Sequence, residues 1–103
     1  MSWNNIHVDD YGWVGKLRIV QDGVAVDISS YTTRTFIFTP PDEEEVEKTA
    51  TFTTTGTDGY LQYTAEAAFY DTVGVWKVRA LVEKTGSELT SATLYFYVKA
   101  REG

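Results

Sequence analysis

The chain has 103 residues, no cysteine, and 15 acidic against 9 basic side chains, a formal net charge of −6. A chain of this length forms one domain with one modest core, and without cysteine neither a disulfide framework nor a thiolate metal site can stabilise that core. The negative charge excludes a general electrostatic attraction to nucleic acid or anionic lipid, so we expect neither a nucleic-acid nor a membrane partner.

Residues 1–12 are predicted to form an amino-terminal arm. The segment has no basic and no apolar region of the kind found in secretory signals. Trp3 stands among polar residues, with no evident contact inside its own chain, and is predicted to dock on a neighbouring subunit. Ile6 and Val8 belong to the same arm, and its main chain is expected to pair with a neighbour's sheet.

The first half of the chain contains three predicted strands. Residues 13–20 place Trp13, Gly15, Leu17 and Ile19 on one face of an alternating segment. Asp22-Gly23 then predicts a hairpin turn with a return strand over residues 24–28. Residues 33–39 are rich in β-branched and aromatic side chains and predict a third strand, which Pro40 ends.

Two more strands and one helical turn are predicted next. Residues 46–53 alternate between a half-apolar face of Val46, Lys48, Ala50 and Phe52 and a face of threonines and Glu47. Residues 60–64 return as a strand after a glycine-rich turn. Residues 65–70 are the one helix candidate, about two turns at most, which Thr64 could cap.

The last two predicted strands cover residues 76–83 and 89–100. The first alternates apolar Trp76 and Val78 with charged Lys77 and Arg79. The second is expected to bury Ala92, Leu94, Phe96 and Val98 and to expose Thr93, Tyr95, Tyr97 and Lys99. If these strands pair, Lys77, Arg79 and Lys99 approach one another, which we interpret as a solvated strand face.

About seven strands with regular turn signals and one short helical turn predict an all-β fold, an antiparallel two-sheet sandwich. The sandwich would occupy residues 13–100, and residues 101–103 would be a short tail. A small barrel is the alternative architecture.

Four segments carry a family resemblance: Ile6-His7-Val8-Asp9-Asp10-Tyr11-Gly12, Val26-Asp27-Ile28-Ser29, Thr57-Asp58-Gly59 and Gly74-Val75-Trp76-Lys77-Val78. They resemble the small immunoglobulin-like domains of phage tails. Over nearly the whole chain, in the same order, they are similar to the amino-terminal domain of the siphophage upper baseplate protein family. The resemblance implies an immunoglobulin-like sandwich and a non-catalytic piece that joins components at the host-facing end of a virion.

No residue constellation predicts a reaction. His7 is the single histidine, and no serine lies in a Gly-x-Ser-x-Gly turn to receive it. Asp9-Asp10 and the acidic run 42–45 lack the alternating spacing of a calcium loop. We therefore expect no catalytic residue, no metal and no cofactor.

The expected function is that of a non-enzymatic virion protein of the tail or baseplate, assembled in the bacterial host cytoplasm, which docks on other phage structural proteins or on copies of itself. The candidate partner contacts are Trp3, Ile6, Val8, Tyr95 and Tyr97. The alternatives are a head-surface decoration protein and a carbohydrate-binding module with a flat row of Tyr60, Tyr95 and Tyr97.

Overall fold

The computed structural model describes Trp3, residues 6–8, Gly12, and residues 14–41, 44–66 and 69–100. These residues form strands and connections with no helix, which confirms the all-β prediction. The helical turn expected over residues 65–70 falls partly outside the described residues, at positions 67 and 68. The described part holds a single turn bond there, from the Phe69 amide to the Glu66 carbonyl at 3.2 Å.

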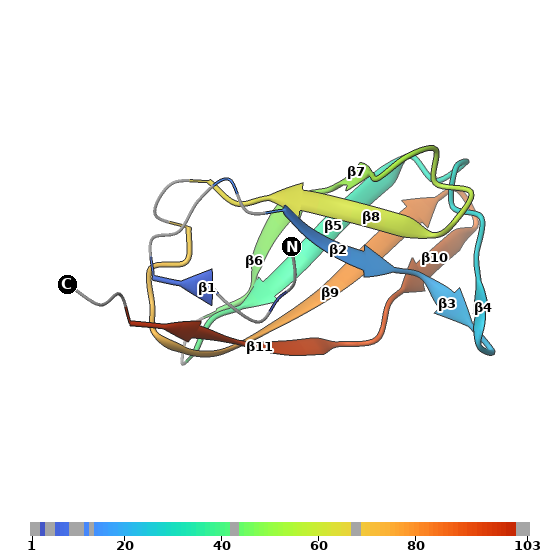
Figure 1. Ribbon diagram of the computed structural model, residues 1–103. Helices are drawn as coiled ribbons and strands as arrows, with labels where there is room; N and C mark the ends of the chain where they lie inside the picture. Colours follow the sequence, from blue (N-terminus) through green and yellow to red (C-terminus); the bar gives the residue numbers. More distant parts are fainter. Residues whose placement is uncertain are drawn as a thin grey trace.

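The strands form two sheets and a small hairpin (Figure 1). The larger sheet contains β1 (Ile6–His7), β11 (Leu94–Lys99), β9 (Gly74–Lys84), β5 (Thr33–Thr39) and β6 (Val46–Thr49) in that order, and β10 (Ser87–Thr90) also pairs with β9. The smaller sheet has the order β2 (Val14–Arg18), β8 (Tyr60–Thr64), β7 (Thr51–Phe52). The hairpin joins β3 (Val20–Gln21) to β4 (Val24–Ala25).

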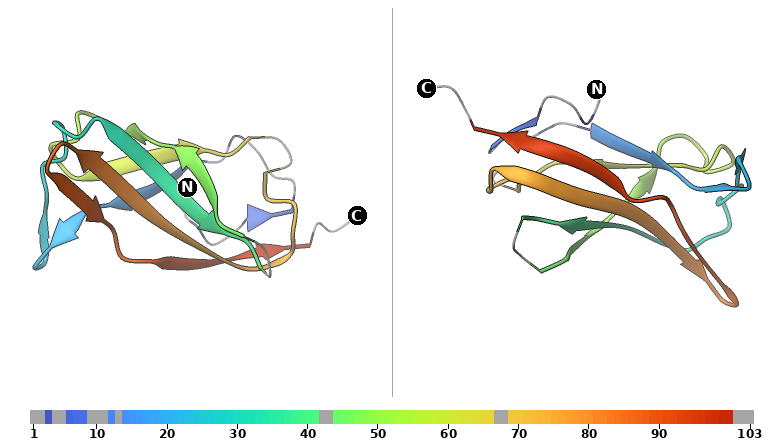
Figure 2. Two further views of the ribbon diagram at one scale, coloured as in Figure 1. Left: turned by 180° about the vertical axis from the view of Figure 1, so that it is seen from behind. Right: turned by 90° about the horizontal axis from the view of Figure 1, so that it is seen from below.

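One hydrophobic core lies between the two sheets. Figure 2 shows them as two layers, with β2 on one side of β9 and β5. Leu17, Leu61 and Tyr63 reach the core from the smaller sheet, and the larger sheet contributes more aromatic side chains to the same cluster. The buried members from the larger sheet include Phe36, Phe38, Trp76, Val78 and Phe96.

Two predicted strands have the expected bounds, since β5 and β8 cover residues 33–39 and 60–64. The Asp22-Gly23 hairpin is also confirmed. Asp22 and Gly23 have φ angles of 52° and 79°, and Gln21 faces Val24 across the turn. Positive φ at both central residues is what a two-residue type I′ turn requires. The predicted strand over residues 13–20 is divided at Ile19, and position 13 lies outside the described residues.

The segment 46–53 passes from one sheet to the other. β6 pairs with β5 in the larger sheet, whereas β7 pairs with β8 in the smaller one. Ala50 lies between them, fully buried, and its amide donates to the Arg34 carbonyl at 2.9 Å. The predicted alternation is confirmed, because Lys48 and Phe52 are partly buried while Thr49 and Thr51 are exposed.

The last predicted strand is interrupted by a bulge, and this overturns one core assignment. Thr90 faces Leu81 and Leu94 faces Val78, so three residues, 91–93, lie opposite two, 79–80. One extra residue inverts the alternation of side chains. The expectation that Ala92 is buried is therefore wrong, since it is exposed. Ser91 links the bulge to β9, because its hydroxyl oxygen accepts a hydrogen bond from the Ala80 amide at 2.8 Å.

The larger sheet is mixed, so the purely antiparallel prediction is wrong at one edge. β1 pairs in parallel with β11, with Ile6 opposite Val98 and His7 opposite Lys99. The Val8 amide extends the pairing by donating to the Lys99 carbonyl at 2.8 Å. The arm's main chain therefore pairs with β11 of its own chain here. The tail 101–103 lies outside the described residues.

Candidate functional site

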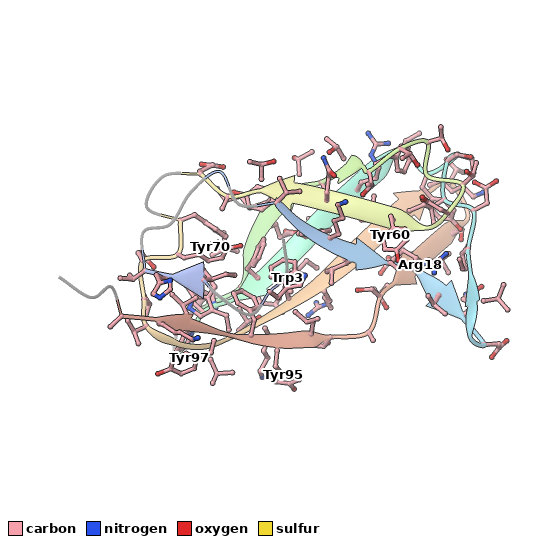
Figure 3. The ribbon with its side chains drawn as sticks, in the orientation of Figure 1. Trp3, Arg18, Tyr60, Tyr70, Tyr95 and Tyr97 are labelled. Carbon is pink, nitrogen blue, oxygen red and sulfur yellow. The ribbon has the colours of Figure 1, made fainter. Side chains whose placement is uncertain are left out.

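The outer face of β9 and β11 is the most prominent apolar surface among the described residues. Val75, Tyr95 and Tyr97 are 53%, 63% and 50% exposed. Tyr97 lies opposite Val75, and Tyr95 lies opposite Lys77, on neighbouring antiparallel strands. Both tyrosines point away from the sheet (Figure 3). We call Val75, Lys77, Tyr95, Tyr97 and Lys99 the outer-face strip.

Strand alternation places these side chains outside. On β11, Phe96 and Val98 enter the core, so Tyr95, Tyr97 and Lys99 must face solvent. On β9, burial of Trp76 and Val78 directs Val75 and Lys77 outward in the same way. The strip therefore stands on a rigid, paired sheet whose inner face is held by the core.

A shallow depression of about 280 Å³ adjoins the strip beside Tyr95. Its floor includes Ile37, which is buried although it belongs to the outward face of β5. At its rim, an Arg79 guanidinium nitrogen donates to a Glu45 carboxylate oxygen at 3.1 Å. Lys77, Thr39 and Thr93 also line it, and the Lys77 ammonium lies 5.7 Å from the centre of the Tyr95 ring. The depression is polar, open to solvent, and bordered by one aromatic wall.

The three cations of this face do not converge. Lys77 and Arg79 are neighbours on β9. Lys99 lies on β11 four residues beyond Tyr95, the residue that pairs with Lys77, so about 13 Å of strand separates the two lysines. No single anion bridges them, and the interpretation of a solvated strand face applies to each lysine separately.

Trp3 has contacts within its own chain, contrary to the expectation that it has none. Its ring centre lies 5.0 Å from that of Phe96, and it also neighbours Phe36 and Phe38 at 6.5 and 6.4 Å. Its indole nitrogen donates to the Lys16 carbonyl at 3.1 Å. The ring therefore covers the gap between β2 and β11, as its central position in Figure 3 shows.

Ile6 and Val8 are also placed by the core. Ile6 is fully buried in the hydrophobic cluster of its own chain, so its side chain is not exposed as a candidate contact residue would be. Val8 is partly buried and packs against the same cluster. Tyr95 and Tyr97 face solvent, as the alternation predicts.

We predict that Trp3→Ala destabilises the isolated chain by about 2 kcal/mol, because a partly buried indole loses its ring contacts and a hydrogen bond. Urea denaturation followed by circular dichroism measures the change. Trp3→Phe is the matched variant, since it keeps one aromatic ring and loses the bond to Lys16 with the smaller part of the ring contacts, and should cost about 1 kcal/mol. If Trp3→Ala were as stable as the wild type, Trp3 would not stabilise its own chain, and the prediction that it docks on a neighbouring subunit would be favoured again.

The tyrosine row proposed for carbohydrate binding does not exist. Tyr60 lies on β8 in the smaller sheet, whereas Tyr95 and Tyr97 lie on β11 in the larger one. In Figure 3, Tyr60 and its neighbour Arg18 lie apart from the two strip tyrosines, which stand at the lower edge of the view. The Arg18 guanidinium stacks 4.7 Å from the Tyr60 ring centre, and its Nε donates to the Asp58 carbonyl at 2.9 Å.

Two titratable groups with shifted pKa values, Tyr63 and Glu66, lie together at the end of β8. The Tyr63 hydroxyl donates to a Glu66 carboxylate oxygen at 3.1 Å, and the Lys48 ammonium lies 3.2 Å from the same oxygen. Lys48 and then Tyr63 hold the pKa of Glu66 below its ordinary value. Burial, followed by the bond to Glu66, raises the pKa of Tyr63 to about 12.

The raised pKa of Tyr63 predicts loss of stability in alkali. Between about pH 10 and 12 the unfolded chain has released this proton and the folded chain retains it, so the free energy of unfolding falls as the pH rises. Below pH 10 the contribution is complete. We expect urea midpoints to fall less steeply between pH 10 and 12 in Tyr63→Phe than in the wild type. Identical slopes would contradict this assignment.

Other chemistry-bearing residues form no candidate site in the part of the chain that the structure describes. No group of three or more His, Cys, Asp or Glu side chains lies together there. His7, on β1, lies opposite Lys99 on β11. Asp9, Asp10 and positions 42 and 43 lie outside the described residues. No helix in the described part is long and apolar enough to cross a membrane.

Sequence reasoning missed Val75 and the depression. The signal for Val75 was present, because it precedes Trp76 by one residue in an alternating strand and must face outward. The depression had no local signal, since it combines residues from the β5, β6 and β9 regions with the bulge before β11.

Searches against protein-family models and against curated proteins find no match for the chain.

Proposed function

We propose that the domain is immunoglobulin-like. Its larger sheet has the order β11-β9-β5-β6, with the short β1 added in parallel to β11, and its smaller sheet has the order β2-β8-β7. In an immunoglobulin-like sandwich, strands C, F and G form one sheet and strands A, B, E and D form the other. The crossing at Ala50, from β6 into β7, supports this connectivity.

The proposed function is that of a non-enzymatic phage virion protein of the tail or baseplate, which docks on other virion proteins. The exposed Val75, Tyr95 and Tyr97 carry the docking part, because aromatic residues on a rigid surface are typical anchors of protein interfaces. The phage origin rests on the resemblance of the turn and core segments to baseplate immunoglobulin-like domains. A head-surface role requires the same docking chemistry at a different place in the particle.

The direct test of virion location is the particle itself. Mass spectrometry of purified phage particles should detect the chain, and a gold-labelled antibody against it should mark the tail in electron micrographs. Labelling of the head would select the decoration role. Absence of the chain from purified particles would refute the virion proposal.

Docking predicts a specific effect of the strip tyrosines. The double variant Tyr95→Ala/Tyr97→Ala should lose incorporation into particles by tenfold or more, since interface aromatics cost about 2 kcal/mol or more when truncated. Its free energy of unfolding should fall by less than about 1 kcal/mol per site, because both rings are exposed. Tyr60→Ala, on the opposite face, is the matched control and should incorporate normally. Equal incorporation of all three proteins would contradict docking through this face.

A further inference from the structure

The outer-face strip has a charge opposite to that of the chain. Lys77 and Lys99 form no ion pair in the described part of the protein, while the whole chain carries −6. Arg79, next to Lys77 on the outward side of β9, forms an ion pair with Glu45. Glu83 shares the outward side of β9 but lies six residues, about 20 Å, from Lys77. The strip is therefore a local positive region on an acidic protein.

Apolar surface fills the space between the two lysines. Tyr95, Val75 and Tyr97 follow one another in register along the paired strands from Lys77 toward Lys99. The spacing of about 13 Å along the strands equals about four residues of extended chain. A ligand that matches the strip thus has two negative charges about four residues apart, with an apolar group between them.

Symmetric self-association does not satisfy this pattern. A two-fold interface places the same patch of each copy against the other, and would bring lysines of one strip against lysines of the second. Like charges in contact across an interface oppose binding. The partner surface is therefore different in kind from the strip itself.

Resting on the proposed docking function, we infer that the outer-face strip binds an acidic, extended segment of another protein. Carboxylates of that segment pair with Lys77 and Lys99, and an apolar side chain between them packs on Val75 and Tyr97. A carboxylate that pairs with Lys77 also lies at the mouth of the depression, where the hydroxyls of Thr39 and Thr93 are available to donate.

Selection from a displayed library of random nine-residue peptides on the immobilised full chain tests this inference. Recovered peptides should be enriched in Asp or Glu about four positions apart, with an apolar residue between them. Binding should weaken about tenfold in Lys77→Glu/Lys99→Glu and weaken further as salt rises from about 50 to 300 mM. Lys16→Glu, an exposed reversal on β2 of the other sheet, is the control and should bind normally.

The outcomes separate this inference from the proposed function. The selection could instead recover neutral or basic peptides whose binding depends on Tyr95 and Tyr97 but not on the lysines. That result would be consistent with docking on this face and would contradict the inference that the partner segment is acidic. Recovery of no peptide that requires the tyrosines would count against docking on this face altogether. Salt-sensitive self-association of the chain in sedimentation would assign the acidic surface to a second copy. If polygalacturonate bound as tightly as the recovered peptides and its binding also required the lysines, the ligand of the strip would be an acidic sugar. Self-association of this kind or such sugar binding would overturn an acidic peptide as the partner.

Discussion

Replacing Trp76 with alanine is expected to lower the free energy of unfolding by about 3–5 kcal/mol. The indole is fully buried, and its ring centre lies 5.4 Å from Tyr70, 5.8 Å from Phe69 and 6.1 Å from Phe96. Its Nε1 also donates to the Thr72 carbonyl at 2.8 Å, which joins the corner before β9 to the core. The loss is a large fraction of the roughly 5–15 kcal/mol that stabilises a small domain.

Thermal and urea denaturation measure this effect, and two variants separate its causes. Trp76→Phe keeps a ring in the cavity and loses the bond to Thr72, so it should cost clearly less than alanine. Val75→Ala, one residue away on the exposed face, should cost less than about 1 kcal/mol. A Trp76→Ala protein as stable as Val75→Ala would show that the aromatic cluster does not hold this end of the sandwich together.

Gly59→Ala is expected to destabilise the chain by about 2–4 kcal/mol, the sum of two backbone effects. Gly59 has a φ of +80°, a left-handed conformation that side chains disfavour. An added Cβ would also stand 2.8 Å from the Ile19 carbonyl oxygen and 3.1 Å from that of Val26. These contacts are with backbone atoms, which cannot rotate away. They lie beside the bond from the Ile19 amide to the Gly59 carbonyl.

Gly86→Ala is the matched control, because Gly86 has nearly the same φ, +84°, with nothing within 4 Å of the added Cβ. It should show only the conformational cost, about 1 kcal/mol. The difference between the two urea midpoints isolates the steric contribution at Gly59. Equal destabilisation would mean that the backbone around Ile19 and Val26 relaxes freely.

The sequence predicted the strands well where the pattern was local and uninterrupted. Residues 33–39 and 60–64 were bounded by prolines or turn glycines, and both strands have the expected limits. The face of Lys48 and Phe52 and the outward position of Tyr95 followed from the same alternation. Side-chain direction in a strand depends on counting residues by two, which needs no knowledge of the partner strand.

Strand alternation also predicted the exposed tyrosines of the candidate site, but not the contacts of the amino-terminal arm. Tyr95 and Tyr97 are exposed as expected, whereas Trp3 and Ile6 were assigned to a partner because no local pattern connects them to the core. Two of their contacts, that of Trp3 with Phe96 and that of Ile6 with Val98, are with residues about 90 positions later in the chain. Only the pairing of β1 with β11 brings those segments together.

The sequence by itself therefore determined an all-β chain, most strand positions, and which side chains share a face. Tertiary structure decided the parallel edge, the crossing at Ala50 between sheets, and the bulge at residues 91–93 that exposes Ala92. It also assembled the depression beside Tyr95 from separate strands. The physical reason is that alternation is set by neighbouring residues along the chain, whereas register, bulges and sheet order depend on which distant strands pair and how they share one core.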